Sequence, residues 1–210
     1  AETMASALSG DGNVDIVAAT REGALFILDE MITGFRFGIG GAQERYHIQP
    51  DLCTYGKGIA NGYSCAVLAG RREVMELGGL RHDKPRVFLA STTHGAETIA
   101  LAAARAAIGV VERADVARHL WDYGARLQEG LRQRIATAGL AETLGVVGFP
   151  CNMSMQFKES DGTPSPYLRT LFLQEMIAQR ILFQGSFVIS FSHDDVAIAE
   201  RPADGSLGEA

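Results

Sequence analysis

The sequence predicts an α/β fold that divides near residue 140, where a smaller α+β unit begins. The short apolar run 24–28 is typical of a strand buried on both faces, as in parallel sheets covered by helices. An alanine-rich stretch within 95–112 has high helix propensity. Beyond residue 140 the pattern changes to short strands and a single helix, which favours a separate small domain.

The first part of the chain alternates short strands with glycine-rich connections. Each apolar run is too short for a stable helix and is bounded by glycine or charged residues. The elements expected here are a short helix at 14–22, strands at 24–28, 51–55 and 64–69, a glycine-rich loop at 33–45 and a short helix at 71–77.

Two long helical patterns follow in the chain before the division near residue 140. An apolar stripe at 3.6-residue spacing runs through Leu120, Tyr123, Leu127 and Leu131. The elements expected from here on are helices at 95–112 and 114–138, strands at 144–149 and 152–157, a helix at 167–179 and a strand at 187–191.

Composition excludes several classes of protein. The chain has 210 residues and a net charge of −6 with mixed signs, and it lacks the basic block of a nucleic-acid binder. Cys53, Cys65 and Cys151 are too few and too widely spaced for a zinc site or a disulfide framework, so we expect buried thiols in a reducing cytoplasm. The start has no signal-peptide pattern and no initiator Met, which predicts a fragment of a longer protein.

Three features carry candidate chemistry. Asp29 follows the apolar run 24–28, Lys57 lies between two glycines after a second strand, and Thr92 and Thr93 precede a long helix. The ends of buried strands and the amino ends of helices are common ligand sites in α/β proteins. Each feature also has an ordinary interpretation: a helix cap or ion pair, a surface lysine, and a threonine cap.

A magnesium-dependent ATPase is the sharpest rival interpretation of an apolar strand that ends in Asp29-Glu30. That class also needs the phosphate-binding motif G-x-x-x-x-G-K-[ST], which this chain does not contain. The ATPase interpretation is therefore rejected.

The three features gain weight from the order of the motifs around them. The ordered segments are 29–36 (DEMITGFR), 41–43 (GAQ), 50–52 (PDL), 56–62 (GKGIANG), 70–75 (GRREVM) and, later, 186–195 (SFVISFSHDD). This series resembles the class III aminotransferases, which depend on pyridoxal 5'-phosphate, and in particular their branch similar to glutamate-1-semialdehyde 2,1-aminomutase.

The resemblance implies an aspartate-aminotransferase-like fold of type I, with residues 1–139 in the large cofactor domain and 140–210 in a small carboxy-terminal domain. It implies that Lys57 is the catalytic lysine that forms a Schiff base with the cofactor, and that Asp29 binds the pyridine nitrogen. It further implies that Met31 packs on the ring and that Thr92, or the adjacent Thr93, reaches the phosphate of the neighbouring subunit in a homodimer.

The implied reaction moves an amino group between an amine or amino acid and a carbonyl acceptor. An intramolecular aminomutase uses the same residues, so the sequence leaves both reactions open. A non-catalytic fragment is the third possibility, because residues 1–28 match neither the family's small-residue phosphate loop nor its ring-stacking aromatic residue. The sequence does not identify the substrate.

Overall fold

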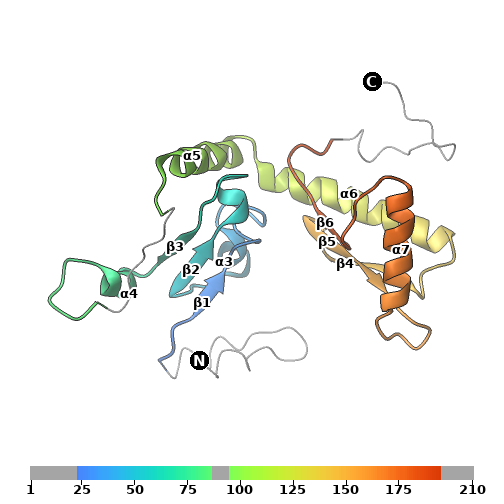
Figure 1. Ribbon diagram of the computed structural model, residues 1–210, viewed down its shortest axis with the longest axis horizontal. Helices are drawn as coiled ribbons and strands as arrows, with labels where there is room; N and C mark the ends of the chain where they lie inside the picture. The colour runs from blue at the N-terminus through green and yellow to red at the C-terminus, as the bar shows by residue number, and fades with distance from the viewer. Residues whose placement is uncertain (1–22, 87–94, 195–210) are drawn as a thin grey trace. The chain divides into compact units, whose positions relative to one another are not determined.

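The computed structural model describes residues 23–86 and 95–194, and these form two compact units (Figure 1). The units divide between Asp115 and Val116. The division at 139/140, expected from the change in sequence pattern and from the family resemblance, stays a prediction. The helix expected at 14–22 lies outside the described residues.

The first unit is built on a three-stranded sheet in the order β1-β2-β3. Its strands are β1 (Ile27–Asp29), β2 (Leu52–Tyr55) and β3 (Val67–Gly70). β1 and β2 run parallel and β2 and β3 antiparallel. The strands predicted from the apolar runs are present, so the sheet carries the parallel pair that the α/β prediction required.

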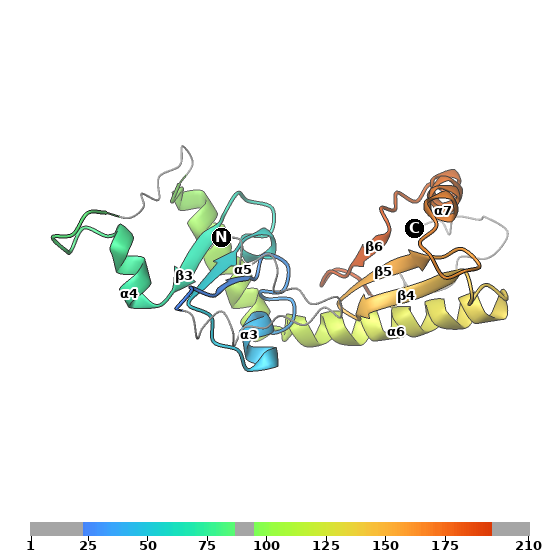
Figure 2. The same cartoon turned by 90° about the horizontal axis from the view of Figure 1, so that it is seen from below.

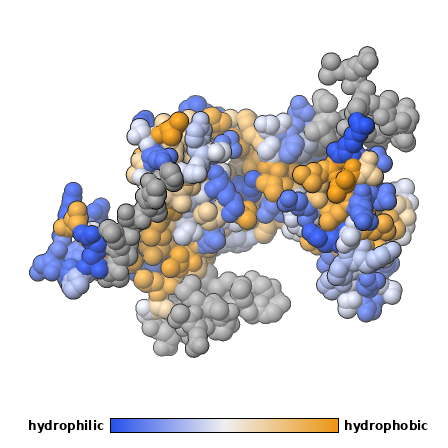
Figure 3. Space-filling view, in the orientation of Figure 1, coloured by the Kyte–Doolittle hydropathy of each residue, from blue (hydrophilic) through white to orange (hydrophobic). Residues whose placement is uncertain are grey.

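The prediction that the 24–28 strand is buried on both faces is wrong for this chain. Tyr55 and Val67 pack in the core of the unit, on one face of the sheet. On the opposite face Ile27 and Leu68 are 42% and 41% exposed. Figure 3 shows hydrophobic side chains at the surface over these strands. The apolar side chains of the run could be buried on both faces of the sheet, but the described residues cover one face of the sheet and leave the other exposed.

The helices of the first unit are mostly short. They are α3 (Gly41–Tyr46), the 3-10 turn η1 (Lys57–Ile59), α4 (Arg72–Met75), the 3-10 turn η2 (Glu76–Gly78) and the longer α5 (Thr98–Arg113). The predicted loop at 33–45 is therefore only partly a loop. α3 forms because the Glu30 carboxylate accepts the backbone N–H groups of Ala42 and Gln43 at its first turn.

The second unit packs two helices with an antiparallel sheet in the order β4-β5-β6. Its elements are α6 (Val116–Thr137), β4 (Leu144–Phe149), β5 (Asn152–Phe157), α7 (Pro166–Ala178) and β6 (Ser186–Val188). β4 and β5 have the predicted bounds. The last strand is shorter than predicted, because the N–H of Ser190 donates to Nδ1 of His193 and turns the chain there.

The core of the second unit lies between α6 and its sheet (Figure 2). Cys151 and Met153 are fully buried. Gly124 of α6 lies where a side chain would overlap the backbone of Pro150 and Cys151, so its lack of a Cβ lets the helix approach the β4–β5 turn. None of the helices in the described ranges is long and apolar enough to cross a membrane.

All three cysteines are free thiols. Cys53 and Cys151 are buried as predicted, and Cys65 is half-buried.

Candidate active site

The carboxyl ends of β1 and β2 meet at one edge of the first sheet. In the parallel register Asp29 lies opposite Thr54. Lys57 follows β2 after a single glycine, at the start of η1. The structure therefore brings Asp29 and Lys57, which are 28 positions apart in the chain, to neighbouring strand ends. This edge of an open α/β sheet is where ligands bind in such folds.

Asp29 is held by two hydrogen bonds. Its Oδ1 accepts the backbone N–H of Met31 at 2.8 Å and the hydroxyl of Thr54 at 3.2 Å. The first bond closes a tight turn at the end of β1, and the second crosses to β2. Asp29 itself remains exposed, so its carboxylate is open to a ligand.

Lys57 has an unusual backbone conformation. Its φ is +46°, in the left-handed region that residues other than glycine seldom adopt. Its side chain is exposed, and a Cβ placed on the neighbouring Gly58 would meet no atom within 4 Å. On the other side, a Cβ on Gly56 would overlap the Met31 thioether. We call the segment from Gly56 to Ile59 the lysine turn. Met31 therefore packs directly beside the lysine turn, and open space lies next to Lys57.

The lysine turn packs against helix α5. Ile59 and Ala60 are 6% and 2% exposed and pack against Ala104 of that helix. Small side chains on α5 let the turn approach the helix closely. The alanine-rich stretch that predicted a helix therefore also fixes the position of Lys57.

The sequence motifs did not identify Glu30 as a residue that shapes the site. It is 1% exposed, and its carboxylate accepts hydrogen bonds from the Thr33 hydroxyl and from the N–H groups of Ala42 and Gln43. Alternation along β1 directs Asp29 and Glu30 to opposite faces of the sheet. A second acid directly after a strand-end aspartate, followed by a glycine-rich loop, is the signal that points to such an anchor.

A polar chain continues from this loop to β2. The Gln43 side-chain amide donates to the Tyr55 hydroxyl at 2.7 Å. Burial raises the pKa of the Tyr55 phenol, and the hydrogen bond to Cys53 raises it further. Burial also raises the pKa of the Cys53 thiol. Both groups therefore stay neutral at physiological pH and support the loop without adding charge.

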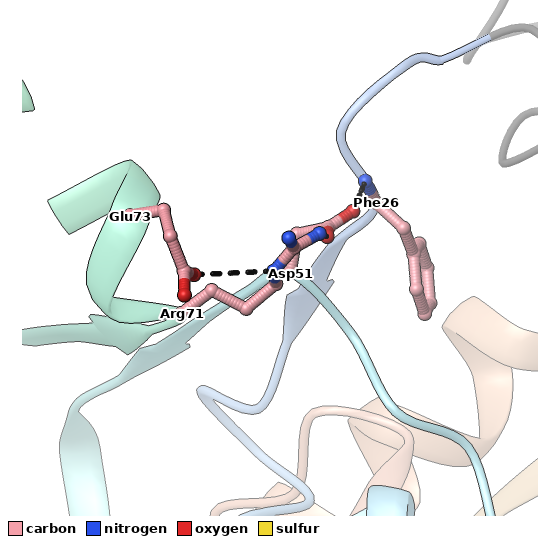
Figure 4. Close-up of polar contacts among 4 residues, drawn as sticks. All are labelled: Phe26, Asp51, Arg71 and Glu73. Atoms are coloured by element: carbon pink, nitrogen blue, oxygen red, sulfur yellow. Dashed lines mark hydrogen bonds and ion pairs between the residues drawn. The ribbon is translucent and has the colours of Figure 1, made fainter.

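Asp51 ties the start of β2 to both neighbouring strands (Figure 4). Its carboxylate accepts the N–H of Phe26 at 2.8 Å and a guanidinium N–H of Arg71 at 2.7 Å. The Phe26 hydrogen bond, followed by Arg71, lowers the pKa of Asp51. Arg71 also lies 3.6 Å from a carboxylate oxygen of Glu73. These contacts fix the end of the sheet opposite the Asp29 edge.

The predicted phosphate ligand, Thr92, and the adjacent Thr93 lie outside the described residues. The structure thus places Asp29, Met31 and Lys57 together and describes neither threonine. Across 23–86 and 95–194, no group of three His, Cys, Asp or Glu side chains is positioned to hold a metal ion.

Comparison with known proteins identifies the family. The model of the aminotransferase class-III family matches residues 16–191. The chain is 40% identical over 131 residues to a glutamate-1-semialdehyde 2,1-aminomutase from Thermus thermophilus, an alignment that covers 60% of this chain and 29% of the relative. The chain therefore spans under a third of that curated relative's length.

Solved structures share the fold. A beta-phenylalanine aminotransferase from Variovorax paradoxus superposes with a TM-score of 0.72 at 25% identity, covering 87% of this chain and 43% of that one. The PLP internal aldimine form of the Sphingopyxis FumI protein gives a TM-score of 0.74 at 20% identity, covering 87% and 42%. The predicted type I fold is thereby confirmed, and the chain belongs to the class III aminotransferase family.

Proposed function

We propose that the full-length protein is an aminotransferase that uses pyridoxal 5'-phosphate to move an amino group between an amine or amino acid and a carbonyl acceptor. One observation carries the proposal: the parallel register of β1 and β2 puts the residues Asp29 and Lys57 at neighbouring strand ends. A carboxylate for a ring nitrogen and a lysine for an aldehyde are the two groups that this cofactor requires.

The residues present fit that cofactor. Asp29 is exposed and fixed by its contacts to Met31 and Thr54. Open space lies beside Lys57, and the Met31 side chain packs at the same turn. Lys57 would hold the cofactor through its amine, Asp29 would bind the ring nitrogen, and Met31 would pack on one face of the ring. Thr92, with Thr93 as the alternative, would bind the phosphate.

The protein groups then have separate tasks. When bound, pyridoxal phosphate supplies an electron sink for the carbon that loses a proton. The Nζ of Lys57 would remove the proton from the α-carbon of the substrate and deliver it to carbon C4′ of the cofactor in the same half-reaction. The Asp29 carboxylate would keep the ring nitrogen protonated by accepting its hydrogen bond. Ile59 and Ala60, packed on α5, would keep the lysine turn in place.

An amino-donor assay without acceptor tests this proposal. The full-length protein loaded with pyridoxal phosphate should change its visible spectrum when a suitable donor is added. Lys57→Ala should slow that change by about 10²- to 10⁴-fold, because a positioned proton-transfer group contributes that much. Lys158→Ala, in the second unit, is the matched control. Equal rates in both variants would refute the assignment of Lys57.

An intramolecular aminomutase is the second candidate, and the identity with the Thermus aminomutase favours it. Both reactions use the same residues of this chain. They differ in whether turnover needs a separate amino acceptor. Turnover of a single substrate that carries both the amino and the carbonyl group, with no added acceptor, would select the aminomutase.

We also propose a cytoplasmic homodimer. The family resemblance implies that Thr92 binds the cofactor phosphate of the neighbouring subunit, which requires a dimer. A dimer in which Thr92→Ala weakens cofactor binding would support the assignment. Unchanged binding in Thr92→Ala, with weaker binding in Thr93→Ala, would move the role to Thr93.

A further inference from the structure

Both hydrogen bonds that hold the Asp29 carboxylate end on the same oxygen. Oδ1 accepts the N–H of Met31 and the hydroxyl of Thr54. No residue within the described ranges donates to Oδ2. The carboxylate is therefore anchored through one oxygen, and the other is left for a ligand.

Thr54 owes its position to the strand register. It lies directly opposite Asp29 in the parallel ladder and on the same face of the sheet. On its other side Thr54 pairs with Leu68, whose side chain offers no hydrogen bond. The Thr54 hydroxyl is thus the side-chain donor that the neighbouring strand directs at Asp29.

We infer that Thr54 is a positioning residue for Asp29. Its hydroxyl fixes the carboxylate so that Oδ2 accepts the hydrogen bond of a protonated pyridine nitrogen. The inference rests on the proposed function, since it assumes that Asp29 binds that nitrogen. A group whose orientation is set by a neighbouring hydrogen bond holds its ligand better than one that must be ordered on binding.

The test uses the full-length holoenzyme loaded with pyridoxal phosphate labelled with ¹⁵N in the ring. Thr54→Val removes the hydroxyl and keeps the branched shape, and Thr54→Ser restores the hydroxyl. Thr54→Ala is a second variant without the hydroxyl, should valine disturb folding. Thr170→Val is the control, because it removes a threonine hydroxyl from α7, in the second unit.

We expect Thr54→Val and Thr54→Ala to move the ¹⁵N resonance toward that of a neutral pyridine. We expect their affinity for pyridoxal phosphate to fall about three- to tenfold, as for the loss of one hydrogen bond. Thr54→Ser and Thr170→Val should keep the resonance and affinity of the wild type. A role in strand stability alone would change the unfolding temperature but leave the resonance in place.

The inference is overturned if both variants without the hydroxyl keep the wild-type resonance and affinity. Failure of the proposed function has a different signature. In that case the wild type itself would form no covalent adduct at Lys57, and both proposals would fall together.

Discussion

At the scale of the residue, the site depends on two adjacent acids with separate tasks. Asp29 and Glu30 follow each other at the end of β1, so the strand directs them to opposite faces. Asp29 is exposed and faces the proposed ligand, whereas Glu30 is 1% exposed and binds three donors of its own chain. Residue type alone does not separate these tasks, but their positions along the strand do.

Asp51 should make stability depend on pH. Its lowered pKa means that the folded state favours the charged carboxylate. That stabilisation is complete above the ordinary aspartate pKa of about 3.9 and is lost as the pH falls through the lower folded value. We expect Asp51→Asn to lower the free energy of unfolding by about 1–2 kcal/mol at pH 7, and by progressively less below pH ~4.

Urea unfolding of wild type and Asp51→Asn across that pH range measures the effect. Arg71→Met should have the smaller effect of the two variants. The Phe26 N–H is the larger cause of the shift, and the Arg71 side chain is 57% exposed. A difference between wild type and Asp51→Asn that stays constant from pH 7 to pH 3 would contradict this account.

At the scale of the element, the buried Glu30 carboxylate builds the loop between β1 and β2. Glu30→Ala would leave three donors without their acceptor, two of them at the start of α3. We expect a loss of about 2–4 kcal/mol in the free energy of unfolding. Glu44→Ala is the control, because among the described residues the exposed Glu44 carboxylate accepts one backbone N–H, that of Gly40, and its loss should cost under about 1 kcal/mol. If thermal unfolding shows similar losses of stability for Glu30→Ala and Glu44→Ala, Glu30 does not anchor the loop.

Two glycines of α6 should respond in opposite directions to the same substitution. A Cβ at Gly124 would overlap the backbone at Pro150, whereas one at Gly130 would meet nothing within 4 Å. Gly124→Ala should destabilise the protein by about 1–3 kcal/mol through overpacking. Gly130→Ala should stabilise it by about 0.5–1 kcal/mol, since alanine is the better helix former. Denaturant midpoints check both, and a stabilising Gly124→Ala would show that α6 does not approach the turn this closely.

Most elements could be predicted because their local patterns agree with their packing. β4 and β5 have the predicted bounds, and along β5 buried residues alternate with more exposed ones, as a strand packed on one face requires. α3 could not be predicted in this way. It has six residues, and its first turn is satisfied by Glu30, which lies outside the helix.

At the scale of the whole molecule, the site could be predicted only in part. Motif order in the sequence named Asp29, Met31 and Lys57, and the fold brings them together. The contact between Thr54 and Asp29 could not be predicted, because it depends on which strands pair and in what register. For Glu30 the sequence offers its place directly after Asp29 as a signal, but its three donors are set by how the loop after β1 folds back. Burial of β1 was overestimated for a related reason: a strand pattern reports what its side chains can bury, not what covers them.

The most direct test of Lys57 as the cofactor lysine is chemical. Borohydride reduction of the full-length protein with its cofactor should leave pyridoxal phosphate permanently attached to one lysine. Peptide mapping by mass spectrometry then locates that lysine. This chain contains three lysines, Lys57, Lys84 and Lys158. We predict an adduct on Lys57 that is lost in Lys57→Ala and kept in Lys84→Ala. An adduct on Lys84, on Lys158 or on any other lysine of the protein would contradict the assignment.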